Sequence, residues 1–326
     1  MRVLPAVPTT RQSLIAAGWS SSQLDAKLRS ARLASPFRGV LAEPVHLAGV
    51  LGRVKAALLT QHPNAIAAMQ TAAVLRRFRW LPESWAVANA TVHLAVGQND
   101  AHRQRAGMRL HHRLLTADDV TVVQGIPCMS ATRTLVELAR DPTLNELLVV
   151  QIIDGALRDG HSSRAELLAC LSRFPGERYV ARARRLVNRS REGVDSPPET
   201  TIRLILEDED IHVEPGLEIC DDDGLVLARA DLGIRRYLLW GEYDGFDPHS
   251  KKPVFRGDRV GDRWLHRRGW HTMRFVDIDL QRPDRIRAEW RQAIADAPLR
   301  IAALDPRRSP EIAVAQQMLG VGPAAA

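Results

Sequence analysis

The sequence of 326 residues predicts an α/β (α+β) protein with more than one domain. Three observations lead to this class. Two short helical patterns meet at a glycine near the N-terminus, helix and strand patterns alternate through the middle, and a β-hairpin, a basic helix and a strand follow near the C-terminus. We expect domains over residues 1–50, 51–194 and 195–295, with a flexible tail over 296–326.

The first 50 residues show the pattern of a helix-turn-helix. A helix over 10–17 ends at Gly18, and serines at 20–22 offer caps for a second helix over 23–31. Residues 33–41 alternate like a small hairpin, which predicts a wing beside the two helices. The sequence therefore predicts a winged-helix-like domain.

The second helix of such a domain contacts DNA through its exposed polar and basic side chains. The candidate DNA-binding residues are Ser21, Ser22, Lys27 and Arg29. The alternative is a small helical cap whose basic residues serve solubility.

The middle region mixes helix and strand patterns. Helices are predicted over residues 54–59, 65–78, 130–139, 144–158, 164–171 and 179–188. Strands are predicted over residues 84–88, 92–96, 108–114 and 120–123. His111 and His112 are adjacent on a strand and so point to opposite faces, which favours a structural or phosphate-contacting role over joint metal binding.

Three carboxylates mark the predicted hairpin near the C-terminus. If its turn is centred on Arg235-Arg236, Asp231 lies opposite Trp240, and Glu242 is a diagonal neighbour about 7–8 Å away. Asp244 shares the face of Glu242 because side chains alternate along a strand. One Mg²⁺ or Mn²⁺ ion could bridge such carboxylates and activate water for phosphodiester hydrolysis. The alternative is an exposed polar strand face.

A basic helix is predicted after the hairpin. Arg259, Arg263 and Arg267 recur every four residues and form one stripe on a helix. Gly269 is suited to end this helix, and an apolar run over 270–276 predicts a strand. The alternative is a solvated helix face. The candidate phosphate contacts in this region are Lys251, Lys252, Arg259 and Arg263.

Glu199 allows two interpretations. Ser196-Pro-Pro-Glu199 fits a capping box, in which Ser196 caps a helix and Glu199 bonds back to the cap. The same carboxylate could instead support the acidic site of the hairpin.

The C-terminal motifs resemble the PD-(D/E)XK nuclease superfamily, most closely its branch similar to very-short-patch-repair endonucleases. The resemblance covers roughly residues 195–280. Its motifs are Ser196-Pro-Pro-Glu199, Arg229-Ala-Asp231, Glu242-Tyr-Asp-Gly245, Asp258-Arg259 with Arg263, and Gly269-Trp270 with Arg274-Phe275. The resemblance implies a restriction-endonuclease-like fold with a central mixed sheet, Asp231 and Glu242 as metal ligands, and a contribution from Glu199.

One position departs from the superfamily pattern. Asp244 stands where a lysine is usual, two residues after the acidic ligand. Asp244 could then hold a second cation, or Lys251 or Lys252 could supply the missing positive charge. His249 is a further candidate ligand or general base.

The N-terminal motifs resemble the N-terminal domain of AbiEi-type antitoxins. The shared features, over about 40 residues, are the glycine turn, the second helix and the Arg38-Gly39-Val40 end. His111-His-Arg113 and residues 125–135 are similar to segments of the same actinobacterial proteins. This resemblance implies a toxin–antitoxin role and a possible cognate toxin.

Composition narrows the class of protein further. No run approaches the ~20 apolar residues of a membrane span, and the N-terminus does not resemble a secretory signal. We therefore expect a cytoplasmic protein with no membrane partner. The three cysteines, Cys128, Cys170 and Cys220, lie far apart and predict neither disulfides nor zinc.

Charge is distributed unevenly along the chain. Residues 1–194 carry 26 Lys and Arg against 14 Asp and Glu, whereas residues 195–280 carry 12 against 19. A basic N-terminal part favours nucleic acid as a partner.

Three hypotheses for the function follow. The first is a DNA-binding protein whose C-terminal domain is an Mg²⁺- or Mn²⁺-dependent DNA endonuclease, with Asp231, Glu242, Asp244 and Glu199 in its catalytic site. The second is a non-enzymatic AbiEi-type antitoxin or transcriptional repressor that uses a degenerate nuclease fold for binding. The third is an inert interaction scaffold.

Overall fold

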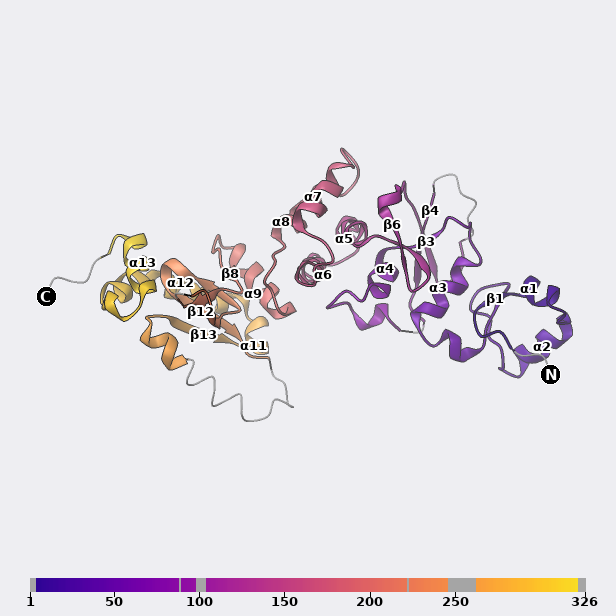
Figure 1. The fold of residues 1–326 in the computed structure, drawn as a ribbon, viewed down its shortest axis with the longest axis horizontal. Helices are drawn as coiled ribbons and strands as arrows, with labels where there is room; N and C mark the ends of the chain where they lie inside the picture. Colours follow the sequence, from indigo (N-terminus) through magenta and orange to yellow (C-terminus); the bar gives the residue numbers. More distant parts are fainter. Residues whose placement is uncertain (1–3, 88, 98–103, 222, 246–261, 322–326) are drawn as a thin grey trace. The chain divides into compact units, whose positions relative to one another are not determined.

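The computed structural model describes residues 4–87, 89–97, 104–221, 223–245 and 262–321. The chain forms two compact units, Met1–Asn188 and Arg189–Ala326. Figure 1 colours the chain by residue number, from indigo at the N-terminus to yellow at the C-terminus. Each unit combines helices with a β-sheet, so the predicted α/β (α+β) class is confirmed. Within the described ranges, no helix is both long and apolar enough to cross a bilayer.

The start of the N-terminal unit contains the predicted pair of helices. α1 (Arg11–Ala16) and α2 (Ser21–Arg29) are joined through Gly18, whose φ of +92° is a conformation that favours glycine. The Ser20 hydroxyl accepts a hydrogen bond from the Gln23 amide, and the Gln23 side chain accepts one from the Ser20 amide. This capping box fixes the start of α2. The buried side chains of this small core are Leu14, Trp19, Leu24, Leu33 and Leu41.

The wing differs from the predicted hairpin over 33–41. β2 (Val40–Leu41) pairs in antiparallel fashion with β1 (Thr9–Thr10), and a single bridge joins Ala34 to Ala42. Pro36 gives the physical reason, because it has no N–H group to donate to a hairpin ladder. The wing strand is therefore fixed to the segment that leads into α1.

The rest of the N-terminal unit is built on a five-stranded mixed sheet with the order β5-β4-β3-β7-β6. Its strands are β3 (Ile66–Ala67), β4 (Val92–Val96), β5 (Met108–His112), β6 (Val120–Val123) and β7 (Ile126–Met129). β4 runs parallel to β5 and antiparallel to β3. All five residues of β4 are buried, as expected for an inner strand of a covered sheet.

Helices precede, interrupt and follow this sheet. They are η1 (Pro44–Leu47), α3 (Val50–Leu58), α4 (Met69–Leu75), η2 (Glu83–Trp85), η3 (Ala117–Asp119), α5 (Ala131–Arg140), α6 (Glu146–Arg158), α7 (Arg164–Ser172) and α8 (Val180–Arg189). The predicted cap of α5 is confirmed, since the Ser130 hydroxyl accepts a hydrogen bond from the Arg133 amide.

Two predictions for this region were wrong. The helix over 65–78 is interrupted because residues 66–67 pair with neighbouring strands, so that α4 begins only at Met69. The strand over 84–88 is instead the 3₁₀ turn η2, which starts directly after Pro82 and is closed by a bond from the Ala86 amide to the Glu83 carbonyl.

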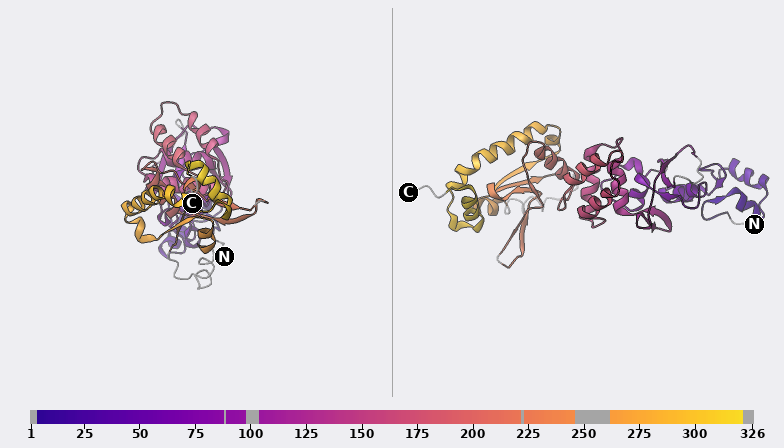
Figure 2. Two further views of the ribbon diagram at one scale, coloured as in Figure 1. Left: turned by 90° about the vertical axis from the view of Figure 1, so that its left-hand side faces the viewer. Right: turned by 90° about the horizontal axis from the view of Figure 1, so that it is seen from above.

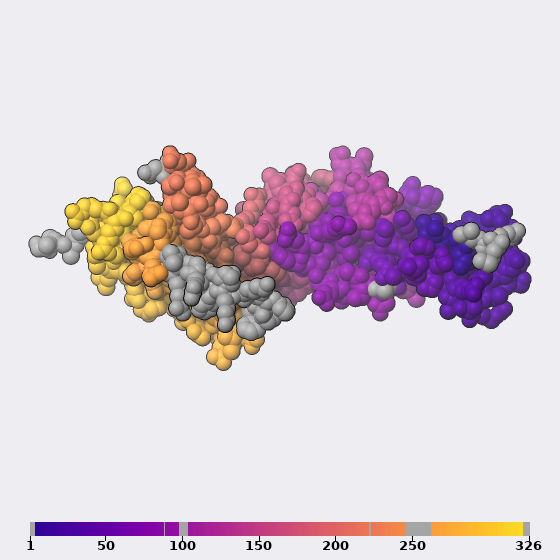
Figure 3. Space-filling model, turned by 60° about the horizontal axis from the view of Figure 1, so that its bottom comes forward, coloured from indigo at the N-terminus to yellow at the C-terminus, as the bar shows by residue number. Residues whose placement is uncertain are grey.

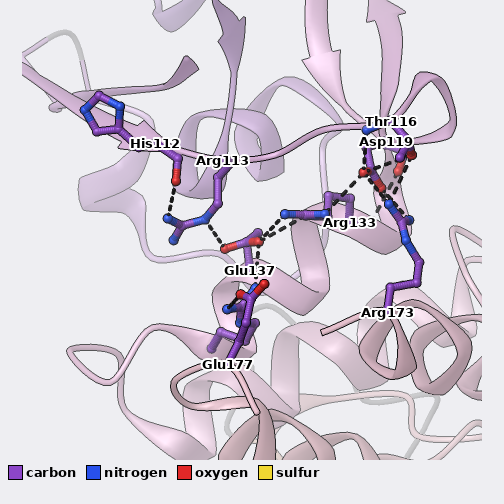
Figure 4. Close-up of polar contacts among 10 residues, drawn as sticks. His112, Arg113, Thr116, Asp119, Arg133, Glu137, Arg173 and Glu177 are labelled. Carbon is purple, nitrogen blue, oxygen red and sulfur yellow. Dashed lines mark hydrogen bonds and ion pairs between the residues drawn. The ribbon is translucent and has the colours of Figure 1, made fainter. Parts of the chain in front are cut away.

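A buried network of ion pairs joins the sheet to the helices that follow it (Figure 4). Arg133 of α5 lies 3.2 Å from Asp119 and 2.8 Å from Glu137, and all three side chains are buried. Arg113, just after β5, lies 2.7 Å from Glu137. Arg173, just after α7, lies 2.7 Å from Asp119. The network therefore links segments far apart in sequence.

An aromatic ring completes this network. The guanidinium groups of Arg133, Arg140 and Arg173 lie 4.5, 4.9 and 5.6 Å from the centre of the Phe174 ring. Cation–π attraction of this kind strengthens when the partners are removed from water. The cost of burying the Arg133 charge is thus offset by the carboxylates of Asp119 and Glu137 and by the Phe174 ring.

The C-terminal unit begins with α9 (Pro197–Glu207) and a four-stranded sheet with the order β13-β12-β11-β8. Its strands are β8 (Glu214–Pro215), β11 (Leu232–Ile234), β12 (Leu239–Tyr243) and β13 (His271–Phe275). β11 and β12 form the predicted hairpin, and β13 lies parallel to β12. A separate hairpin of β9 (Glu218–Cys220) and β10 (Val226–Arg229) projects from this unit in the right-hand view of Figure 2.

Helices cover the C-terminal sheet. They are residues 262–267, α11 (Asp277–Leu280), α12 (Pro283–Ala302), η5 (Pro306–Arg308) and α13 (Pro310–Leu319). Gly241 of β12 allows α12 to approach closely, because a Cβ at this position would lie 2.8 Å from the Trp290 ring. Trp290 is completely buried at this contact. The predicted helix end at Gly269 is also confirmed, with φ of +84°.

The expected flexible tail over 296–326 is a correction. α12 continues to Ala302, and α13 packs onto the same unit, as the yellow residues of Figure 3 show. Ile312 and Ala315 of α13 are buried in a core with Trp240 and Trp270. The physical reason is that α13 has an apolar face, whose burial offsets the cost of ordering the chain.

The buried network around Glu137 generates the first testable prediction. Glu137→Ala leaves the buried Arg133 with one carboxylate partner fewer. Removal of one partner of a buried ion pair lowers the free energy of unfolding by about 3–5 kcal/mol. We expect the α5 amides to exchange hydrogen for deuterium at least about 100-fold faster. The matched control is Glu177→Ala, which removes a 53% exposed carboxylate that pairs with Arg140. Equal exchange rates in the two variants would contradict the importance of the network.

Candidate functional site

The hairpin of the C-terminal unit brings Asp231 and Glu242 together. Leu232 pairs with Gly241, so the residues one step further out, Asp231 and Glu242, lie opposite each other. The Tyr243 amide donates a hydrogen bond of 2.7 Å to Asp231 Oδ2. The register therefore places Asp231 and Glu242 opposite each other, rather than on the predicted diagonal.

The predicted register of this hairpin was wrong by two residues. Gly233, not Asp231, pairs with Trp240. The cause is the turn, in which η4 (Arg235–Tyr237) is followed by Leu238 in the left-handed conformation, with φ of +49°. Such a turn is longer than the assumed one, because it contains a 3₁₀ segment.

Arg274 of β13 provides the positive charge of this acidic site. Its position on the strand pairs it with Glu242, and its guanidinium lies 3.0 Å from Glu242 Oε2. The same group lies 3.1 Å from Asp244 Oδ2 and 2.8 Å from Asp262 Oδ1. Burial lowers the pKa of Arg274, but these three carboxylates outweigh burial and raise it. Arg274 therefore stays charged and binds the acidic cluster as an internal cation.

Glu199 lies at the buried side of the same cluster. Its two carboxylate oxygens accept hydrogen bonds from the Asp195 amide, at 2.8 Å, and from the Ser196 hydroxyl, at 2.7 Å. Burial raises the pKa of Glu199 to about 7, with a smaller contribution from the charge of Asp231. The predicted cap at Ser196 is present, since its hydroxyl accepts a hydrogen bond of 3.5 Å from the Glu199 amide. The predicted bond from Glu199 back to the Ser196 amide is replaced by one to the Asp195 amide.

Asp231 is electrostatically linked to its neighbours on both sides. Burial raises its pKa, and the charges of Glu242 and Asp195 raise it further, while the bond from the Tyr243 amide lowers it. Burial is the largest cause of the raised pKa of both Asp231 and Glu199, and the charge of a neighbouring carboxylate adds to it in each case. Among the described carboxylates of this site, Arg274 forms an ion pair with Glu242 and not with Glu199.

The described residues do not fit a divalent cation as they are arranged. Among these residues, no three His, Cys, Asp or Glu side chains converge as metal ligands. Glu242 already accepts a hydrogen bond from the Trp240 ring nitrogen at 2.8 Å and pairs with Arg274, while both oxygens of Asp244 contact Arg274. A cation at Glu242 and Asp244 would therefore have to displace Arg274.

Several predicted contacts of the C-terminal unit lie outside the described residues. These are Lys251, Lys252 and Arg259, together with the alternative ligand His249. Arg263 is described, and it is an exposed residue of the helix over 262–267. Arg274 belongs to one of the sequence motifs, but its role could not be predicted, because that role depends on the parallel pairing of β12 with β13.

Residues 1–50, here called the head, contain the candidate DNA-binding residues, which lie on α2. Ser21 and Ser22 are exposed, but the Ser21 hydroxyl binds Arg11 at 2.7 Å, and the Ser22 hydroxyl binds Ser20 at 2.9 Å. Lys27 is half-buried, and Arg29 is exposed. Both lie in the last turn of α2. The two cations are therefore better placed than the two serines to contact phosphate.

Comparison with known proteins places an antitoxin resemblance in the N-terminal unit. Residues 65–189 match the family described as AbiEi antitoxin C-terminal domain. The sequence motifs that resemble the same antitoxins lie mainly in residues 1–50. The matched residues instead contain the five-stranded sheet, α4 to α8 and the buried network of Glu137.

Two relatives from Mycobacterium tuberculosis match most of the chain. They are named uncharacterized protein MT2308, of strain CDC 1551 / Oshkosh, and uncharacterized protein Rv2248, of strain ATCC 25618 / H37Rv. Each is 25% identical over 271 residues, which cover 82% of this chain and 94% of the relative. Because 271 residues exceed the length of either unit, the similarity includes parts of both.

The raised pKa of Glu199 generates the second prediction. We expect the Glu199 carboxyl carbon to titrate near pH 7 in ¹³C NMR spectra of the full chain, with Glu199→Gln identifying the signal. A folded pKa above the ordinary 4.5 means that this group's stabilising contribution is complete below about pH 4.5 and is lost as pH rises through 7. Titration of every glutamate below pH 5 would contradict the raised pKa of Glu199.

Proposed function

We propose that this protein is a DNA-binding regulator of the antitoxin type. The observation that supports the proposal most directly is the match of residues 65–189 to the AbiEi antitoxin C-terminal domain. In this proposal, residues 1–50 bind duplex DNA, and the matched domain binds a cognate toxin. The C-terminal unit contributes binding without hydrolysis.

The helix-turn-helix of the head supports DNA as a partner. α2 starts at a defined capping box and is held against α1 by buried Leu14 and Leu24. A helix fixed in this way can present one face to the major groove. Lys27 and Arg29 supply positive charge on α2, and Arg32 and Arg38 are exposed nearby in the sequence. The wing arginine Arg38 precedes Gly39, which turns with φ of +86°.

Arg274 supports a binding role for the C-terminal unit. A hydrolytic site of the predicted kind uses carboxylates to hold a metal ion, which then activates water. Here Arg274 neutralises Glu242 and Asp244 directly. A site that carries its own cation is suited to keep a fixed shape without added metal.

Metal-dependent DNA hydrolysis is the second candidate function. The observation that favours it is that the strand register places Asp231 and Glu242 opposite each other, rather than on a diagonal. The pKa of Asp231 is raised by burial and by Glu242, as in crowded carboxylates of catalytic sites. In this candidate, Mg²⁺ or Mn²⁺ would be held by Asp231 and Glu242 once Arg274 moved away.

DNA binding by the head is the third prediction. The double variant Lys27→Ala/Arg29→Ala should lower the slope of log affinity against log salt by about 1.8, because each phosphate contact contributes about 0.9. The measurement is fluorescence polarisation of a labelled duplex with the full chain at several salt concentrations. Arg164→Ala, which removes an exposed arginine at the start of α7, is the matched control. An unchanged slope in the double variant would contradict DNA binding by the head.

Hydrolysis is tested separately with plasmid DNA. We expect the full chain to leave the plasmid intact in Mg²⁺ or Mn²⁺, and Asp231→Ala to bind duplex as the unaltered chain does. Nicking or linearisation that requires metal and disappears in Asp231→Ala would overturn the binding role in favour of the second candidate.

A further inference from the structure

A basic hollow lies on the C-terminal unit, apart from the acidic site. It has a volume of about 560 Å³ and is lined by Trp264, Arg267, Arg268 and Arg308. The first two residues belong to the helix over 262–267, Arg268 to the turn after it, and Arg308 ends η5. A hollow of this size lies within the range of ligand sites, about 300–1,000 Å³. Its lining of three guanidinium groups selects for an anion.

The floor of the hollow is held in place by its neighbours. The Arg268 guanidinium lies 4.7 Å from the centre of the Trp264 ring and 2.7 Å from Glu311 Oε1. The Ser309 hydroxyl donates a hydrogen bond of 3.1 Å to the Arg268 carbonyl. Arg268 is therefore fixed between a ring, a carboxylate and the start of α13. Preorganisation of this kind lowers the entropy cost of ligand binding.

Two arginines at the hollow keep their charge available. Arg267 and Arg308 are both exposed. Within the described ranges, no carboxylate forms an ion pair with either of them, and the nearby Asp305 pairs with Arg307 instead. Glu311 offsets the charge of Arg268, so Arg267 and Arg308 leave the hollow with excess positive charge. This excess is larger than the single negative charge of a backbone phosphate, so the hollow favours such an anion.

We propose that this hollow binds a phosphate group, which Arg267 and Arg308 grip above the floor of Trp264 and Arg268. A guanidinium group donates two parallel hydrogen bonds to phosphate oxygens, which a lysine cannot do. We assign the phosphate to the backbone of DNA, and this assignment rests on the proposed function. The hollow then gives the C-terminal unit its own nucleic-acid contact, separate from α2.

The first arm of the test uses inorganic phosphate alone with the full chain. The unaltered chain should broaden the ³¹P NMR line of phosphate, and Arg267→Ala/Arg308→Ala should abolish most of this broadening. Arg307→Ala is the matched control, because it removes the neighbouring arginine that pairs with Asp305 and does not line the hollow. Equal broadening by the unaltered chain and the double variant, or none by either, overturns the phosphate site.

The second arm identifies the source of the phosphate. With a labelled duplex, the double variant should lower the salt slope by about 0.9, because the two arginines together contact one phosphate, while Arg307→Ala leaves it unchanged. Phosphate binding that depends on Arg267 and Arg308 with an unchanged duplex slope overturns the assignment to DNA and points to free phosphate. If the unaltered chain binds no duplex, the proposed function fails, while the first arm still decides the phosphate site.

Discussion

The contact of Arg274 with three carboxylates is the constraint on which the C-terminal unit depends. Parallel pairing of β12 with β13 sets Arg274 beside Glu242, and the same guanidinium reaches Asp244 and Asp262. Burial and the charge of Glu242 already raise the pKa of Asp231, and without Arg274 the charge of Glu242 would be left without this partner. A side chain from one strand thus allows the acidic residues of another to lie close together.

The two units solve the problem of buried charge in different ways. In the N-terminal unit, Arg133 and Glu137 are buried with full sets of partners, so charge holds the sheet to α5. In the C-terminal unit, Arg274 is partly exposed, and Glu199 tends to become neutral instead. The first arrangement holds helices and sheet together through buried ion pairs, whereas in the second burial raises the pKa of a carboxylate that has no ion pair among the described residues.

Local features of the fold could be predicted from the sequence. The caps at Ser20, Ser130 and Ser196 depend on residues three positions apart, and the helix end at Gly269 depends on one glycine. The strands over 92–96 and 120–123 were predicted with their observed bounds, because runs rich in β-branched residues favour strands.

Features that depend on distant parts of the chain could not be predicted in this way. The hairpin register was shifted by a turn in which Leu238, not a glycine, has positive φ. The role of Arg274 requires the pairing of two strands separated by the predicted basic helix. The packing of the tail could not be predicted from its own residues, because its partners in the core, such as Trp240 and Trp270, lie far earlier in the chain. The carboxylates were thus predictable as a group, but not the cation that binds them.

We propose that Arg274 takes the place of a metal ion at Glu242 and Asp244, with which it forms ion pairs. The most direct measurement is the amount of free Mn²⁺ in electron paramagnetic resonance spectra, recorded during titration of the full chain and of Arg274→Ala. Little Mn²⁺ should bind to the unaltered chain, and more should bind once Arg274 is removed. Tight Mn²⁺ binding by the unaltered chain that is lost in Glu242→Ala would contradict the claim.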